Sequence, residues 1–191
     1  MMRKILTAAC LLPAVAWLAG CSSAPTLPVA KDVDLDRFMG DWYVIANIPT
    51  RFEVGAHNAI ESYQRDADGS IATTFTYRDG GFHGPEKVMH PRGFVRPGTG
   101  NAVWDMQFVW PIKAEYLVAY VDPAYSQTII ARSALDYVWI MARTPTLTDE
   151  EFAQLERRVH DLGYDLSKLQ KVPQHWGAAA TQKGAPGAAT P

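Results

Sequence analysis

The stretch Gly40-Asp41-Trp42-Tyr43-Val44-Ile45-Ala46-Asn47-Ile48-Pro49 opens the repeating pattern that decides the fold. From Trp42 onward, short runs rich in β-branched and aromatic residues alternate with breaks of Gly, Pro, Asp and Asn, which are residues that favour turns. Such runs predict eight strands, at residues 42–49, 56–65, 70–78, 87–96, 102–109, 115–121, 127–132 and 137–144.

The even spacing of these runs predicts an all-β fold, an antiparallel up-and-down sheet of eight strands. Closing that sheet into a barrel would leave no unpaired edge strand. One helix is expected to follow the strands, at about residues 148–162, because Thr148 and Glu151 form a capping box. Its apolar side chains recur on one face, which predicts packing against the barrel wall. They are Phe152, Leu155, Val159 and Leu162.

The first twenty residues predict a secretory signal peptide. Arg3 and Lys4 precede an uncharged, mostly apolar run that is too short to span a bilayer. The run ends in Leu18-Ala19-Gly20-Cys21, which resembles the lipobox of bacterial lipoproteins. This resemblance implies that signal cleavage leaves Cys21 as an acylated N-terminus. Acyl chains contribute about 0.8 kcal/mol per buried CH₂, so several chains would hold the protein firmly on a membrane.

The rest of the chain divides by composition. Residues 21–31 are rich in Ser, Pro and Ala, which predicts a flexible tether. Residues 32–173 carry the barrel and its helix. Residues 174–191 are rich in Gly, Ala, Thr and Pro, which predicts a disordered tail.

Charge and cysteine content exclude several classes of function. Removing residues 1–20 leaves 191 − 20 = 171 residues and shifts the net charge from −2 to −4, because Arg3 and Lys4 are lost. No basic patch is evident, so a nucleic-acid partner is not expected. Cys10 is lost with the signal and Cys21 is consumed by lipid, so no disulfide or thiolate site is expected. The histidines lack metal-ligand spacing, so no metal is expected; they are His57, His83, His90, His160 and His175.

Three motifs are expected to meet at one end of the barrel. Gly40 and Trp42 open the first strand, Asp122 lies in the turn Val121-Asp122-Pro123-Ala124-Tyr125, and Arg143 ends the eighth strand. In an up-and-down barrel these three positions share one mouth. The Arg143 guanidinium can therefore lie over the Trp42 indole and close that mouth, a cation–π contact worth about 0.5–2 kcal/mol.

These motifs resemble the lipocalin family. The match extends over Asp36-Arg37-Phe38-Met39-Gly40-Asp41-Trp42-Tyr43 and over Asp136-Tyr137-Val138-Trp139-Ile140-Met141-Ala142-Arg143-Thr144-Pro145-Thr146. These segments resemble the bacterial, Blc-like branch of the family, whose members are outer-membrane lipoproteins. The resemblance implies a structural closed end at Gly40, Trp42, Asp122 and Arg143. Together with Ser22 after the cysteine, it implies an outer-membrane lipoprotein that faces the periplasm.

Strand alternation predicts which side chains face the barrel interior. Trp42 and Arg143 set the inward positions of the first and last strands. On the fifth strand Asp105 and Gln107 should face water, so their neighbours face inward. The ligand cavity is therefore expected at Ala46, Ile48, Trp104, Met106, Phe108, Tyr137, Trp139 and Met141, to which the family resemblance adds Ala59, Glu61 and Tyr63.

The expected cavity suits an elongated apolar ligand, because aromatic, Met and Ala positions dominate it. The bacterial branch is associated with fatty acids and lysophospholipids and with membrane maintenance under stress, so the resemblance implies such a ligand. Polar side chains near the open mouth are candidates for contact with a headgroup or for simple surface solvation. They are His57, Glu61, Lys113 and Arg132.

Three alternatives remain open from the sequence. The barrel could carry a non-lipid apolar ligand, such as haem or an isoprenoid pigment. It could be a lipocalin-fold enzyme, although no nucleophile, triad or paired-carboxylate pattern stands out and no catalytic residue is expected. It could also be a structural lipoprotein with a filled barrel. The sequence also leaves open whether the protein forms a homodimer.

Overall fold

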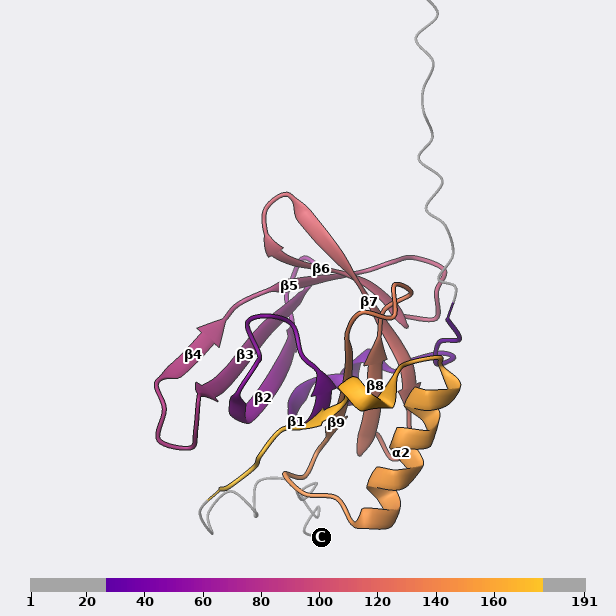
Figure 1. Cartoon of the computed structure of the whole chain (residues 1–191). Helices are drawn as coiled ribbons and strands as arrows, with labels where there is room; N and C mark the ends of the chain where they lie inside the picture. The colour runs from indigo at the N-terminus through magenta and orange to yellow at the C-terminus, as the bar shows by residue number, and fades with distance from the viewer. Residues whose placement is uncertain (1–26, 177–191) are drawn as a thin grey trace, which may run out of the picture.

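The computed structural model describes residues 27–176. The segment expected to be a signal peptide, Cys21 and the residues after Trp176 lie outside these residues. Within residues 27–176 no helix is long and apolar enough to cross a membrane. The described chain forms a closed, antiparallel barrel with one long helix against its wall (Figure 1).

The strands are hydrogen-bonded in the order β10-β1-β2-β3-β5-β6-β7-β8-β9, and β1 also pairs with β9. This last pairing closes the sheet into a barrel. The strands are β1 Gly40–Ile48, β2 Ala56–Arg65, β3 Ile71–Asp79, β4 Glu86–Met89, β5 Arg92–Val95, β6 Val103–Val109, β7 Ile112–Val121, β8 Gln127–Ala131, β9 Val138–Ala142 and β10 Gln170–Lys171.

These ten segments correspond to the eight expected strands, one of which is divided into β4 and β5, and to the short additional strand β10. The strand expected at 87–96 is interrupted at Pro91, which has no N–H to donate to a ladder. Its halves, β4 and β5, both pair with β3. The short β10 pairs with the second half of β1, beyond the residues of β1 that pair with β2. The eight-stranded antiparallel barrel predicted from the sequence is therefore confirmed.

The β6–β7 hairpin is longer than the sequence indicated. Strand β7 begins at Ile112 rather than at Glu115, and Val109 pairs with Ile112 across the turn Trp110-Pro111. The hairpin rises above the rest of the barrel in Figure 1. Its apolar tip thus lies beyond the main body of the barrel.

The predicted helix is present as α2, Asp149–Asp161, with both halves of its capping box. The Glu151 N–H donates to Thr148 Oγ1 over 3.2 Å, and the Thr148 N–H donates to Glu151 Oε2 over 2.8 Å. Its buried side chains Phe152, Leu155 and Val159 pack on the outer face of the barrel wall. That wall consists mainly of Val103, Leu117, Ile129, Ala131, Val138, Ile140 and Ala142.

Two short helices were not predicted. They are α1, Leu35–Phe38, and the 3₁₀ helix η1, Leu166–Lys168. Elements this short have too few residues for an apolar period to be recognised. The Asp34 carboxylate caps α1 by accepting from two backbone N–H groups of its first turn. Helix α1 places Phe38 in the barrel interior, where it is fully buried.

The chain packed against the barrel extends past both boundaries expected from composition. Within the expected tether, the Ala30 N–H donates to the Val118 carbonyl over 2.8 Å, and Leu27 packs on the wall. Within the expected tail, Gln174 Nε2 donates to the carbonyls of Val44 and Ala59. The remaining parts of both segments lie outside the described residues.

The closed end is built around Trp42 and Arg143. Trp42 is fully buried, and its indole N–H donates to the Phe38 carbonyl over 2.8 Å. The Arg143 guanidinium carbon lies 3.8 Å from the centroid of the Trp42 ring, which is the predicted cation–π arrangement. Desolvation lowers the pKa of Arg143 to about 10, so it remains charged at neutral pH.

Backbone carbonyl oxygens accept hydrogen bonds from the Arg143 guanidinium. Nη1 and Nη2 reach carbonyls of the segment that enters β1, and Nε reaches the Tyr125 carbonyl over 3.3 Å. Gly40 adopts a φ of +91°, and a Cβ there would stand 3.4 Å from Nη1. Glycine is therefore favoured both by the backbone conformation and by the close approach of the arginine.

Asp122 organises the neighbouring turn. Its carboxylate accepts from the backbone N–H groups of Ala124, Ser126 and Gln127 and from the Ser126 hydroxyl. The Arg143 N–H donates to the Ser126 carbonyl in the same turn. The three motifs expected to share one mouth do meet there.

Replacing Trp42 by Ala should lower the free energy of unfolding by about 3–5 kcal/mol, because the substitution empties a fully buried site. Urea unfolding measures the change as a shift of the midpoint at an unchanged slope. The matched control is Trp110→Ala, since Trp110 is 82% exposed and should leave the midpoint in place. Equal midpoints for the two variants would contradict the closed-end arrangement.

Candidate functional site

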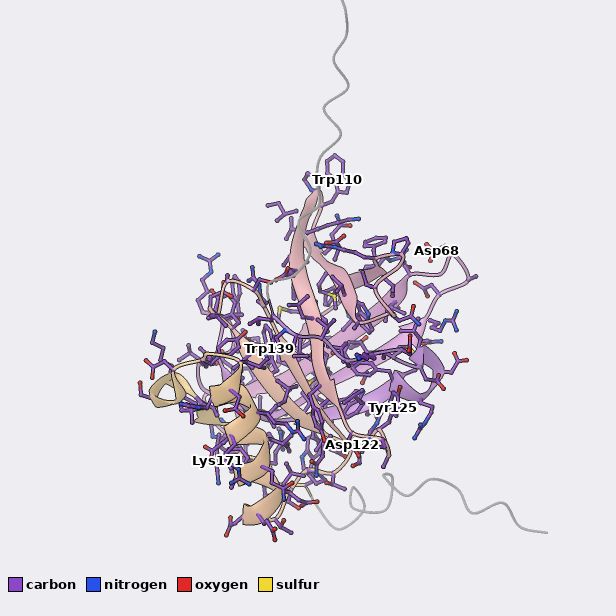
Figure 2. The ribbon with its side chains drawn as sticks, turned by 90° about the vertical axis from the view of Figure 1, so that its right-hand side faces the viewer. Asp68, Trp110, Asp122, Tyr125, Trp139 and Lys171 are labelled. Carbon is purple, nitrogen blue, oxygen red and sulfur yellow. The ribbon has the colours of Figure 1, made fainter. Side chains whose placement is uncertain are left out.

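The open end of the barrel leads into a cavity of about 540 Å³. Its lining includes residues of the β1–β2 loop and of the β6–β7 hairpin, whose tip residue Trp110 lies far from Asp122 and Tyr125 at the closed end in Figure 2. The lining is mostly apolar, with a few charged side chains. It comprises Thr50, Arg51, Phe52, Glu53, Glu61, Phe75, Met89, His90, Pro91, Met106, Phe108, Val109, Ala114, Glu115, Tyr116, Arg132, Tyr137 and Trp139.

Five residues expected from strand alternation and family resemblance lie in this lining. Met106 and Glu61 are buried, and Tyr137 and Trp139 are partly exposed. Phe108 lines the cavity and is 56% exposed, and a register shift in the β6–β7 pairing lies between Met106 and Val109. Orientation toward the cavity is thus as expected at these positions.

Four other expected residues lie in the barrel interior outside the cavity lining. Ala59, Tyr63, Trp104 and Met141 are all buried in the inner core cluster. Tyr63 and Trp104 belong to an aromatic layer, in which the centroid of the Trp104 ring is 5.5 Å from that of Phe38, 5.7 Å from that of Tyr63 and 5.5 Å from that of Tyr116. The Tyr63 and Tyr116 hydroxyls are hydrogen-bonded to each other. This layer fills the lower barrel and forms the floor of the cavity.

The expected inward orientation of Ala46 and Ile48 is wrong. A bulge in β1 between Val44 and Ala46 shifts the register against β9, so Ala46 pairs with Ile140 and Ile48 pairs with Val138. Both then face the outer cluster beneath α2. A one-residue irregularity reverses every later side chain of a strand, and no feature of the sequence marked this one.

The loop between β1 and β2 is part of the site that strand alternation could not predict. Thr50, Arg51, Phe52 and Glu53 line the cavity from this loop. Glu53 is 8% exposed, and its carboxylate accepts from the Thr50 N–H over 2.8 Å and from the Trp139 indole N–H over 2.9 Å. The Tyr77 hydroxyl donates to the Phe52 carbonyl over 2.6 Å. These bonds hold the loop beside the cavity.

Glu61 is the acidic group deepest in the lining. Desolvation raises its pKa to about 8, a nearby hydrogen bond from Tyr63 opposes the shift, and repulsion from Glu53 adds to it. Burial also raises the pKa of Glu53, against its hydrogen bonds from Thr50 and Trp139. At neutral pH Glu61 is therefore mostly a neutral acid, able to donate a hydrogen bond within an apolar cavity.

The candidate headgroup residues divide into two pairs. Glu61 and Arg132 line the cavity, whereas His57 and Lys113 do not. The His57 ring packs at 4.9 Å from the Phe82 ring, and Lys113 Nζ lies 3.9 Å from the centroid of Phe94. Arg132 Nη1 is 3.2 Å from an Asp136 carboxylate oxygen. Buried Nε of Arg132 has no hydrogen-bond partner among the described residues.

No group of three or more His, Cys, Asp or Glu side chains within residues 27–176 is placed to hold a metal ion. Charged side chains of the lining instead make separate hydrogen bonds or ion pairs with neighbouring residues. Glu115, for example, accepts from the Ser133 N–H over 2.6 Å. The arrangement offers an apolar volume with a neutral acid inside and a cation at the mouth.

The free energy of unfolding should fall as the pH rises from about 4.5 to about 8, with Glu61 contributing up to about 1.4 kcal/mol per pH unit. The sign follows because the folded state keeps a proton that the unfolded state releases above its ordinary pKa of 4.5. Glu61→Gln should flatten this slope in urea unfolding across the pH range. Glu150→Gln, on the exposed first turn of α2, should retain it. A Glu61→Gln slope equal to that of the wild type would refute the raised pKa.

Comparison with known proteins gives one family. A Lipocalin-like domain matches residues 33–174. Outer membrane lipoprotein Blc of Escherichia coli is 30% identical over 177 residues, covering 86% of this chain and 97% of the relative. Temperature-induced lipocalin-1 of Arabidopsis thaliana is 30% identical over 166 residues, covering 78% of this chain and 83% of the relative.

Solved structures agree on the fold. Insecticyanin of Manduca sexta matches with a TM-score of 0.62 at 20% identity, covering 84% of this chain and 89% of that one. Lobster apocrustacyanin A1 matches with a TM-score of 0.59 at 15% identity, covering 78% of this chain and 85% of that one. From its closed end, its cavity and these matches, the chain belongs to the lipocalin family.

Proposed function

We propose that this lipocalin binds one elongated apolar ligand, a fatty acid or a lysophospholipid, in the cavity at its open end. The observation that carries the proposal is the apolar cavity of about 540 Å³ above a packed aromatic floor. Its size lies within the ~300–1,000 Å³ usual for small-molecule sites. The floor limits how deep a ligand can enter, so the occupant has one end inside and one at the mouth.

The placement of polar groups supports an amphipathic ligand. The raised pKa of Glu61 keeps the interior largely uncharged at neutral pH, which favours an acyl chain there. Arg132 lies in the mouth, where a carboxylate or phosphate on the ligand would meet its guanidinium. An acyl chain inside and an anionic group at the mouth satisfy both features.

We also propose that the protein is an outer-membrane lipoprotein anchored through acylated Cys21 and facing the periplasm, where it serves membrane maintenance. Cys21 and the preceding segment lie outside the described residues. Support comes from the sequence Leu18-Ala19-Gly20-Cys21-Ser22 and from relatives that are themselves outer membrane lipoproteins. The same comparison supports a role in binding rather than catalysis.

Titration with a lysophospholipid below its micelle concentration should change tryptophan emission, and Trp139→Phe should remove most of that change. Trp139 lines the cavity, whereas Trp104 is buried in the floor below it. Trp104→Phe is therefore the matched control and should keep the response. Direct binding, measured by calorimetry, separates loss of signal from loss of affinity.

If the protein binds neither fatty acids nor lysophospholipids, by tryptophan emission or by calorimetry, the proposal of lipid carriage is rejected. Mass spectrometry of solvent extracts from the purified protein then identifies what the cavity does hold, and absorbance of the protein as isolated reveals haem or a pigment. If binding occurs but both variants respond like the wild type, the ligand lies elsewhere than against Trp139.

Globomycin, which blocks cleavage of lipoprotein signals, should leave a larger, unprocessed precursor in cells that produce this protein. The reason is that a lipoprotein signal is cut before its acylated cysteine by the peptidase that globomycin blocks. Immunoblotting of membrane and periplasmic fractions measures both size and location. Continued processing to a soluble periplasmic form would reject the anchoring proposal but not the lipid-binding one.

A further inference from the structure

Exposed apolar side chains gather at one end of this barrel. Every large hydrophobic residue classed as exposed within residues 27–176 lies in an open-end connection or in strand residues near that end. The connections join β1 to β2, β3 to β4, β6 to β7 and β8 to β9. The residues are Phe52, Val54, Phe82, Val88, Phe108, Val109, Trp110, Ile112 and Leu135.

The tip of the β6–β7 hairpin is the most exposed part of this set. Val109 is 68% exposed, Trp110 is 82% exposed and Ile112 is 71% exposed. Figure 2 shows Trp110 at the extreme end of the molecule, far from Asp122 and Tyr125. Val109 also lines the cavity, so the apolar tip continues directly into the cavity rim.

The closed end has the opposite character. Its surface carries the ion pair Asp36–Arg65 at 2.8 Å, and Arg92 pairs with Asp66 at 3.1 Å and with Asp68 at 3.2 Å. A barrel surrounded by water on all sides has no reason to segregate its apolar surface in this way. Exposed apolar patches of this kind mark contact with another apolar phase or partner.

We propose that the open end is a membrane-docking surface, with the β6–β7 hairpin tip inserted into the lipid leaflet and the cavity mouth facing it. Trp110 suits this position, because indole rings favour the boundary between acyl chains and headgroups. The inference goes beyond the proposed cargo and rests on the proposed function only for the anchor that keeps a bilayer nearby.

The length of the N-terminal segment allows this orientation. Ala30 is hydrogen-bonded to Val118, and six residue steps along β7 lead from Val118 to Ile112, a distance of about 20 Å. Leu27 packs on the barrel wall, so the connecting segment is the one from Cys21 to Leu27, whose six residue steps can span about 20 Å when extended. An anchor at Cys21 can therefore reach the level of the hairpin tip.

Shape and charge favour a bilayer over a second copy of the chain. The apolar side chains project from four separate connections around a cavity mouth, and the longest hairpin stands out from the others, which is not a flat self-complementary face. Charges near the rim have both signs, as with the Arg132–Asp136 pair at 3.2 Å and the Arg78–Glu86 pair at 3.1 Å. Docking should therefore depend on apolar insertion and change little with salt.

The test uses the mature protein purified from cells and phosphatidylcholine vesicles whose acyl chains carry bromine, which quenches tryptophan at contact. Wild-type emission should be quenched, and Trp110→Phe should lose most of the quenching. Trp139→Phe should keep it, because Trp139 lies inside the barrel and not at the tip. Quenching in 0.5 M salt should match that in about 0.1 M salt.

A second variant keeps Trp110 and changes only the insertion. Ile112→Asp puts a charge beside the tip at a 71% exposed position, so the barrel should fold normally while the quenching of Trp110 is lost. The matched control is Gln154→Asp on the exposed face of α2, which should be quenched like the wild type.

Other outcomes overturn the proposal in distinguishable ways. Quenching that disappears in Trp139→Phe and persists in Trp110→Phe means that lipid enters the cavity while the tip stays in water, so docking fails and the proposed cargo stands. Quenching abolished by salt replaces insertion with charge attraction. An unquenched wild type that is a dimer in solution, and that Ile112→Asp converts to a monomer, assigns the surface to a second copy.

Discussion

The Arg143 guanidinium, lying 3.8 Å from the Trp42 ring, organises the closed end on which the rest of the barrel depends. One side chain from the end of β9 takes the carbonyls of the segment around α1 and that of Tyr125, which would otherwise lack donors in a partly buried site. The same guanidinium thus makes the cation–π contact with Trp42 and the hydrogen bonds to the backbone carbonyls. Because both ends of the sheet enter this arrangement, it helps fix the register in which β1 closes on β9.

Above the closed end, the barrel interior is first a packed layer of aromatic rings and then an open cavity. Trp104, Tyr63, Tyr116 and Phe38 fill the lower barrel with rings 5.5–6.5 Å apart. Tyr116 belongs to both regions, because it stacks on Trp104 and also lines the cavity. Aromatic rings in mutual contact fill the floor, whereas the side chains above it leave a cavity of about 540 Å³. Binding capacity therefore lies at the end farthest from the closing interaction.

The two acids of the cavity show how the site balances stability against binding. Glu53 secures the β1–β2 loop to Trp139, and Glu61 stands deeper with a pKa of about 8. A buried carboxyl group with a raised pKa weakens folding at higher pH, so its presence costs stability that an apolar residue would not. Polar groups of this kind in an otherwise apolar cavity are typical of binding sites, where they orient the ligand.

The sequence by itself determined the strand pattern, the capped helix and the meeting of Trp42, Asp122 and Arg143, because these follow from local periodicity and from the topology of an up-and-down barrel. It also placed Met106 and Trp139 correctly. Tertiary structure alone decided the rest. A bulge turned Ala46 and Ile48 outward, since alternation holds only while the register is unbroken. Contacts across the barrel brought Glu53 to Trp139 and divided the inner face into floor and cavity, because depth along a barrel depends on which residues of distant strands pair.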